Sequence, residues 1–277
     1  MALSASLPPS SSSFQQWMRD RYWRIKSALL YQRLYKMLDL QYTVESGLSL
    51  RVASKGEWWI YNDIFVNREY DVPIRQALQS RSPDRPFTVL DLGANVGYFC
   101  LRVLDLMRQS ELQNLTADMT LVEGSPAVYR ELQDRLGSQN LSPMKLRLIH
   151  GLAGRREGSG AIHESAIHVK NTIMQPPRNG SAIVEFVDLA RLMQDRPRID
   201  LLKCDIEGAE LLCIENYPDL LGKVKNAVFE FHDELCDTAK CLSLLDQAGF
   251  RPQVLRACPG ISVRFFSRTE GKGSGAV

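Results

Sequence analysis

The sequence predicts an α/β fold in which a doubly wound, mostly parallel sheet carries helices on both faces. From residue 87 onward, short apolar runs alternate with amphipathic runs of helical period. Such alternation is typical of parallel sheets with crossover helices. The first strand, "FTVLDL", leads into a loop of small residues, "GANVG". The chain closes with two strands whose Pro-Gly link is too short for a helix, so we expect an antiparallel hairpin at one edge.

The elements of this region follow in order. We expect strands at 87–92, 119–124, 145–150, 199–205, 226–231, 251–257 and 261–267, and helices at 96–107, 126–136, 188–195, 209–217 and 237–249. Segment 154–187, rich in Gly, Pro and His, interrupts the alternation, and we interpret it as an inserted hairpin near the mouth of the site. A doubly wound sheet with a late antiparallel strand is the plan of the class I methyltransferases, whereas nicotinamide-binding domains usually stay parallel.

This Rossmann-like domain spans about residues 81–267, and an extension of helix and strands at 14–80 precedes it. Residues 1–13 and 268–277 are rich in Ser, Pro or Gly, so we expect disordered tails. Residues 14–40 predict a basic, aromatic helix, which either makes weak contact with an anionic membrane surface or packs against its own protein.

The rest of the extension predicts short strands within residues 41–72, "YTVESGLSLRVAS" and "EWWIYNDIFVN". A helix from about residue 73 to 80 should follow them.

The composition is that of an ordinary globular protein. Of the 277 residues, 44% are hydrophobic and 24% charged, and the net charge of +2 is too small to indicate nucleic acid as a partner. The six cysteines form no Cys-x-x-Cys pair, so we expect reduced thiols. With no signal-peptide pattern or long apolar run, we expect a cytoplasmic protein. The oligomeric state has no sequence signal.

The loop "DLGANVG" predicts the reagent. Gly93 allows a sharp turn out of the strand, and Gly97 allows close approach to the next helix. A dinucleotide fingerprint would need glycine where Asn95 and Tyr98 stand. A pyrophosphate therefore fits poorly, and a ligand whose anion is one amino-acid carboxylate fits better. S-adenosylmethionine is such a ligand, and S-adenosylhomocysteine would be its product.

The following strands complete the predicted reagent site. Glu123 ends the second strand, where a carboxylate can accept hydrogen bonds from two ribose hydroxyls. Alternatively, Glu123 could be a helix-capping acid before the next helix, with no part in binding the reagent. The third strand ends in "IHGLAG", whose small residues leave room for an adenine edge. The expected reagent-binding residues are Asp91, Gly93, Ala94, Asn95, Gly97, Tyr98, Glu123, Gly124, Gly151, Leu152, Ala153 and Asp205.

The fourth strand brings "IDLLKCDIEGAELLCI". Together with "LDLGANVGYF", "LVEGSPAVYREL" and "VFEFHD", this segment makes the chain resemble the FkbM family of S-adenosylmethionine-dependent methyltransferases. The resemblance covers about residues 57–250. It implies methylation of a hydroxyl oxygen on a small-molecule or sugar acceptor. It also places Tyr70, an expected acceptor-binding residue, in the region that precedes the core.

Lys203, Asp205, Glu207 and His232 are the expected catalytic residues. Lys203 and Asp205 point to one face of a buried strand, where a lysine must be paired. Either Asp205 or His232 could remove the acceptor's proton. Glu230 lies beside His232 and, with His163 and His168 of the insertion, is an expected acceptor-binding residue.

A metal site on Asp205, Glu207 and His232 is the less favoured alternative. The fifth strand lacks the Asp-Asn pair of catechol-type enzymes, and Lys203 would repel a cation. We therefore expect no metal, and we expect Glu210 to cap or stabilise structure.

Two other classes remain as alternatives. One is a nicotinamide-dependent oxidoreductase, which Asn95 and the closing hairpin disfavour. The other is a non-catalytic binding module with a methyltransferase-like fold.

Overall fold

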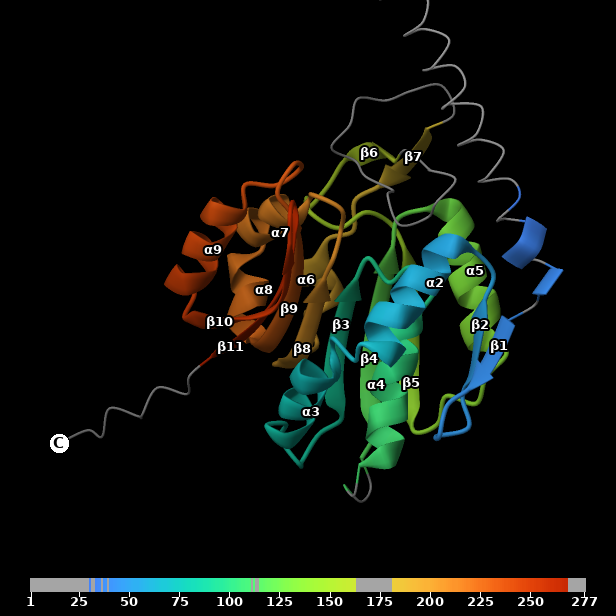
Figure 1. Cartoon of the computed structure of the whole chain (residues 1–277). Helices are drawn as coiled ribbons and strands as arrows, with labels where there is room; N and C mark the ends of the chain where they lie inside the picture. The colour runs from blue at the N-terminus through green and yellow to red at the C-terminus, as the bar shows by residue number, and fades with distance from the viewer. Residues whose placement is uncertain are drawn as a thin grey trace, which may run out of the picture.

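The structure is a computed structural model, and it describes residues 30, 33–35, 37–38, 40–110, 112, 115–162 and 181–268. A seven-stranded sheet forms its centre, with the strand order β10-β11-β9-β8-β3-β4-β5 (Figure 1). The expectations for residues 1–13, for most of 14–40, for His163 and His168, and for 269–277 lie outside the described residues.

Five neighbouring strands of this sheet run parallel, and the last two run antiparallel to their neighbours. Strand β11 lies between β9 and the edge strand β10, so the expected closing hairpin is confirmed. The doubly wound order with this hairpin is the predicted class I methyltransferase fold. The strands are β3 (Phe87–Leu92), β4 (Ala117–Glu123), β5 (Met144–His150), β8 (Ile199–Cys204), β9 (Val224–His232), β10 (Phe250–Cys258) and β11 (Ile261–Arg268).

Helices cover both faces of the sheet and enclose two hydrophobic clusters. Val89 of β3 packs into one cluster and Leu90 into the other, because successive side chains of a strand point to opposite faces. One face carries α3 (Asp71–Gln79), α4 (Tyr98–Gln109) and α5 (Pro126–Gly137). The other carries α6 (Leu189–Leu192), α7 (Glu210–Asn216), α8 (Pro218–Lys223) and α9 (Thr238–Gln247).

The extension begins with an antiparallel hairpin of β1 (Leu40–Thr43) and β2 (Ser49–Val52). The second expected strand, "EWWIYNDIFVN", is wrong: this segment forms α2 (Lys55–Tyr61) and the π-helical turn η1 (Asn62–Val66).

Helical packing of aromatic rings explains this difference. The ring of Tyr61 stacks on those of Trp58 and Phe65, with centroids 5.7 Å apart in each case. Their spacing of three and four residues places them on one helical face. The Ser54 side chain also accepts the N–H of Glu57 and caps the helix start.

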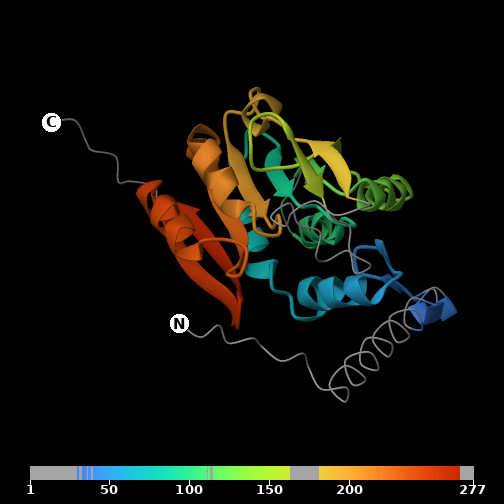
Figure 2. The same ribbon diagram turned by 90° about the horizontal axis from the view of Figure 1, so that it is seen from above.

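Buried ion pairs attach the extension to the domain. Arg102 of α4 donates two hydrogen bonds to Asp71, at 2.7 and 2.6 Å. Arg135 of α5 pairs with Glu57 at 2.5 Å. Seen from above, α2 (light blue) lies between the β1–β2 hairpin and the β10–β11 hairpin (Figure 2). The extension therefore packs against the side of the domain that carries α4 and α5.

The described part of the insertion contains β6 (Ser159–Ile162) and β7 (Ala182–Glu185), which pair antiparallel. Among the described residues, no helix has the length and apolar character needed to span a membrane.

Candidate active site

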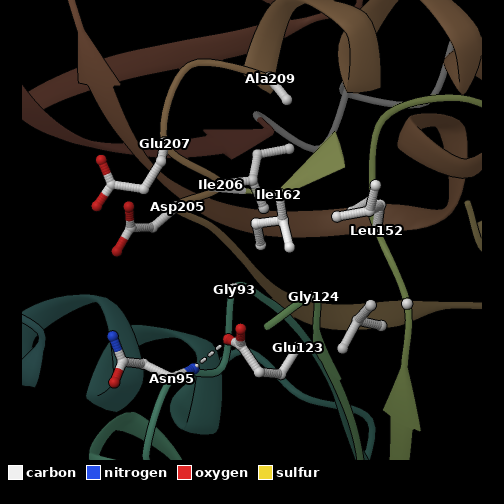
Figure 3. A pocket seen from close by; sticks show the side chains of 13 residues that line it. Gly93, Asn95, Glu123, Gly124, Leu152, Ile162, Asp205, Ile206, Glu207 and Ala209 are labelled. Carbon is white, nitrogen blue, oxygen red and sulfur yellow. Dashed lines mark hydrogen bonds between the residues drawn. The ribbon is translucent and has the colours of Figure 1, made fainter. Parts of the chain in front are cut away.

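A first pocket opens at the carboxyl ends of β3, β4, β5 and β8, the edge at which doubly wound sheets bind ligands. Figure 3 shows Glu123 and Asn95 on one side of it and Asp205 and Glu207 across from them. Many of the predicted reagent-binding residues line it: Gly93, Asn95, Glu123, Gly124, Gly151, Leu152, Ala153 and Asp205.

Gly93 lies where two loops cross. Its φ is +77°, and a Cβ atom there would stand 1.8 Å from the carbonyl oxygen of Asp205. The N–H of Asp205 in turn donates to the carbonyl of Leu92, at 3.1 Å. A side chain at position 93 would therefore push apart the loops after β3 and β8, which form opposite walls of the pocket.

Glu123 is held by backbone N–H groups at both carboxylate oxygens. Asn95 donates to Oε2 at 2.9 Å (dashed line in Figure 3), and Ser125 donates to Oε1 at 2.8 Å. Burial raises the pKa of Glu123, although these two hydrogen bonds oppose the rise. Each oxygen keeps further acceptor capacity for a ligand in the pocket.

The other predicted reagent residues lie elsewhere. Asp91 and Gly97 do not line the first pocket, and Ala94 and Tyr98 line a second pocket beside it. Asp91 is fully buried beneath Lys203, and the Tyr98 hydroxyl donates to the carbonyl of Arg51 at 2.5 Å. Four residues that line the first pocket were not among the residues predicted from the sequence: Val122, Ile162, Ile206 and Ala209. Ile206 follows the predicted Asp205 directly, and Ile162 comes from the insertion.

The second pocket has a volume of about 720 Å³ and shares Gly93, Asn95, Asp205 and Glu207 with the first. It also contains the predicted Lys203, His232, Tyr70 and Glu230. Tyr70 is only 4% exposed and packs its ring edge-on against Phe99, with centroids 5.4 Å apart.

Lys203 lies between three oxygen atoms. Its Nζ donates to the carbonyl of Gly93 at 3.0 Å and lies 3.4 Å from Asp91 Oδ1 and 3.6 Å from Asp205 Oδ2. Burial alone would lower the pKa of Lys203, but Asp91 and Asp205 outweigh it and raise that pKa above its ordinary value. Asp91 is thus a closer partner than the Asp205 that the sequence indicated.

His232 faces two carboxylates at the end of β9. Its Nε2 lies 3.4 Å from Glu207 Oε2 and 3.8 Å from Glu230 Oε1. Burial, followed by repulsion from Asp205, raises the pKa of Glu230 to about 8. Glu207 adopts a positive φ of 54°, an uncommon conformation for a residue with a side chain, and this conformation accompanies the approach of its carboxylate to His232.

Glu210 caps the loop before α7, as expected. Its Oε1 accepts the N–H groups of Ile206 and Gly208, at 3.0 and 3.2 Å. Burial raises the pKa of Glu210 to about 8.

Arg256 is a residue of the second pocket that was not predicted from the sequence. It follows a register shift in β10 and extends into the second pocket, where it contacts Glu69 at 2.8 Å, Glu230 at 3.5 Å and Asp63 at 3.6 Å. Bulges of this kind can redirect a side chain. No sequence pattern indicates that an arginine on this strand would line a pocket.

Residues 91–252, more than half of the chain, match the profile of the Methyltransferase FkbM domain. The chain belongs to this family. The segment that matches contains Glu123, Lys203, Asp205, Glu207 and His232, so it spans the two pockets' shared wall.

Two curated proteins are similar to this FkbM-family chain. Methyltransferase sdnD of Sordaria araneosa is 28% identical over 75% of this chain and 82% of its own length. Methyltransferase 1 of Beauveria bassiana is 27% identical over 72% of this chain and 82% of its own length. Among solved structures, the METTL16 methyltransferase domain aligns with a TM-score of 0.46 and 11% identity, over 86% of this chain and 79% of that one.

Proposed function

We propose that this FkbM-family chain is an S-adenosylmethionine-dependent O-methyltransferase that acts on a hydroxyl of a small-molecule or sugar acceptor. The observation that carries this proposal is the pair of adjoining pockets. They share a wall that contains Asp205 and Glu207, so ligands in the two pockets would meet there. A transfer reaction needs such a junction, because the reacting atoms must be held in line.

The first pocket fits S-adenosylmethionine by its chemistry. Glu123 has acceptor capacity for ribose hydroxyls, and Leu152, Ile162 and Ile206 offer apolar surface for an adenine ring. No basic side chain of the described residues lines this pocket. The pyrophosphate of a dinucleotide would therefore lack a counter-charge, whereas a sulfonium cation suits the carboxylates of Asp205 and Glu207.

The second pocket would hold the acceptor. When bound, S-adenosylmethionine supplies an activated methyl group, so the protein has to position the acceptor and receive its proton. We assign proton acceptance to the His232–Glu207 pair, whose Nε2 and Oε2 atoms lie 3.4 Å apart in this pocket. Asp205, between the pockets, would orient the reagent, and Lys203 would hold Asp205 and the Gly93 loop in place.

Calorimetric titration with S-adenosylhomocysteine, and separately with NADH, tests the reagent. We expect micromolar binding of S-adenosylhomocysteine alone. Glu123→Ala should weaken it about 10- to 100-fold or more, since even one hydrogen bond to a charged group contributes about 1.5–3 kcal/mol. Glu131→Ala, on half-buried α5 surface outside both pockets, is the matched control and should leave the affinity unchanged.

Transfer of labelled methyl from S-adenosylmethionine to a panel of hydroxylated sugars and metabolites tests the reaction. Binding of NADH in place of S-adenosylhomocysteine would overturn the proposal in favour of an oxidoreductase. Reagent binding without transfer to any hydroxyl would favour a binding module.

A further inference from the structure

Two buried polar atoms near Asp205 have no hydrogen-bond partner among the described residues apart from the weak thiol donor of Cys236 beside Glu210. They are Nδ1 of His232 and Oε2 of Glu210. Leaving such an atom unpaired costs about 1–3 kcal/mol, so each one calls for an explanation such as a bound ion. Glu210 is 0% exposed, and no basic side chain of the described residues forms an ion pair with it.

The two residues belong to one cluster. Asp205, Glu210 and His232 each present a ligand atom, and these atoms all lie within 4.8 Å of one another. In an octahedral shell with bonds of about 2.1 Å, neighbouring ligands stand about 3 Å apart and opposite ligands about 4.2 Å apart. The three side chains would have to move only slightly toward an ion for their ligand atoms to reach these octahedral separations. We propose that Asp205, Glu210 and His232 bind one divalent cation.

The ligand types indicate which cation. Carboxylates suit Mg²⁺, Ca²⁺ and Mn²⁺, and imidazole suits softer ions. Mn²⁺ accepts both types, so two carboxylates with one imidazole favour Mn²⁺ or, more weakly, Mg²⁺. The sequence disfavoured a metal on Asp205, Glu207 and His232, because the fifth strand lacks an Asp-Asn pair and Lys203 would repel a cation. The structure adds Glu210 to the set through its second carboxylate oxygen.

The positive charge of Lys203 disfavours a cation at this site, since its Nζ lies 3.6 Å from Asp205 Oδ2. The same Nζ lies nearer to Asp91, whose carboxylate is fully buried and hydrogen-bonded to no other described residue. Asp91 therefore offsets much of the lysine's charge. A cation would face the Oε2 atom of Glu210, which has no basic partner among the described residues.

The ion's role in catalysis rests on the proposed function. Asp205 and His232 line the second pocket, so an ion between them would contact an acceptor hydroxyl and make its proton easier to remove. With the ion on Nδ1, Nε2 of His232 keeps its proton and donates to Glu207. The Glu207 carboxylate would then receive the hydroxyl proton.

The binding test needs no acceptor. Full-length protein is stripped with EDTA, dialysed and titrated with Mn²⁺ by calorimetry and electron paramagnetic resonance, with and without S-adenosylhomocysteine. We expect one Mn²⁺ per chain. His232→Ala and Glu210→Gln should each weaken Mn²⁺ binding about 10-fold or more. Glu234→Gln, an exposed acid of the same pocket outside the cluster, is the matched control and should stay within twofold of the unsubstituted chain.

Circular dichroism melts establish that each variant is folded, and His232→Ala serves if Glu210→Gln does not fold. No stoichiometric Mn²⁺ binding, or equal affinity in His232→Ala and Glu234→Gln, would overturn the metal site. S-adenosylhomocysteine binding separates the two proposals: a protein that binds it but no Mn²⁺ keeps the proposed function and loses only the ion.

Discussion

The first pocket is built largely from backbone and small residues in loops that follow parallel strands, whereas the second is built from long side chains of distant elements. Gly93, Gly124 and Gly151 line the first pocket, and Glu123 is positioned by two backbone N–H groups. The second brings Tyr70 from the extension, His232 from β9 and Arg256 from β10. Backbone and small residues suit the first pocket to a reagent that many enzymes share. Long side chains suit the second pocket to one particular acceptor.

The largest effect should come from the residues assigned to proton acceptance. His232→Ala and Glu207→Gln should each lower kcat about 10²- to 10⁴-fold, the range for loss of a positioned base. S-adenosylhomocysteine affinity should change less than about threefold, because His232 lies outside the first pocket and S-adenosylhomocysteine lacks the sulfonium charge that Glu207 would face. Steady-state kinetics with the acceptor from the panel, beside calorimetry, measures both quantities.

Asp233→Asn is the matched control for this prediction. Asp233 follows His232 directly, but its carboxylate accepts a hydrogen bond from Thr238 at 2.7 Å at the exposed surface. Its kcat should be unchanged. If Asp233→Asn lowered kcat as much as His232→Ala, the second pocket would not be the acceptor site.

Gly93→Ala should be the most damaging change to the first pocket. A left-handed φ of 77° and an overlap at 1.8 Å with the Asp205 carbonyl add strain and steric repulsion. We expect the free energy of unfolding to fall by about 2–4 kcal/mol and S-adenosylhomocysteine affinity to fall about 100-fold. Urea unfolding and calorimetry measure these.

Gly137→Ala, at the end of α5, has no atom within 4 Å of the new Cβ and should not weaken binding. If Gly93→Ala bound the reagent normally, the crossing of the two loops would not shape the first pocket.

The same contrast explains how much the sequence could predict. Periodicity in "FTVLDL" and the short link before "ISVRFFS" reflect local sterics and connection lengths, so the sheet and its hairpin could be predicted. Gly93 and Glu123 stand at strand ends, which a parallel sheet gathers at one edge. The first pocket follows from these rules.

The second pocket depends on packing between segments far apart in the chain. The aromatic run around Trp58 suits a strand by residue type, whereas stacking against Tyr61 and Phe65, together with the Ser54 cap, selects the helix. Arg256 reaches Glu69 across 187 positions through an irregularity in β10. No local pattern encodes such a contact.

The smallest effect, and the sharpest test of the contrast, should come from Arg256→Met. Loss of the guanidinium removes the ion pairs that Arg256 forms with Glu69 and Glu230 and loosens the extension from β10. We expect the acceptor KM to rise about 5- to 10-fold, a change equivalent to about 1–1.4 kcal/mol. Amides of residues 55–70 should exchange hydrogen faster, and S-adenosylhomocysteine affinity should not change.

Arg251→Met, on the same strand but paired with Asp246 at the exposed surface, should change none of these. A matching loss of reagent affinity in Arg256→Met would mean that the extension shapes both pockets, and the division between them would have to be abandoned.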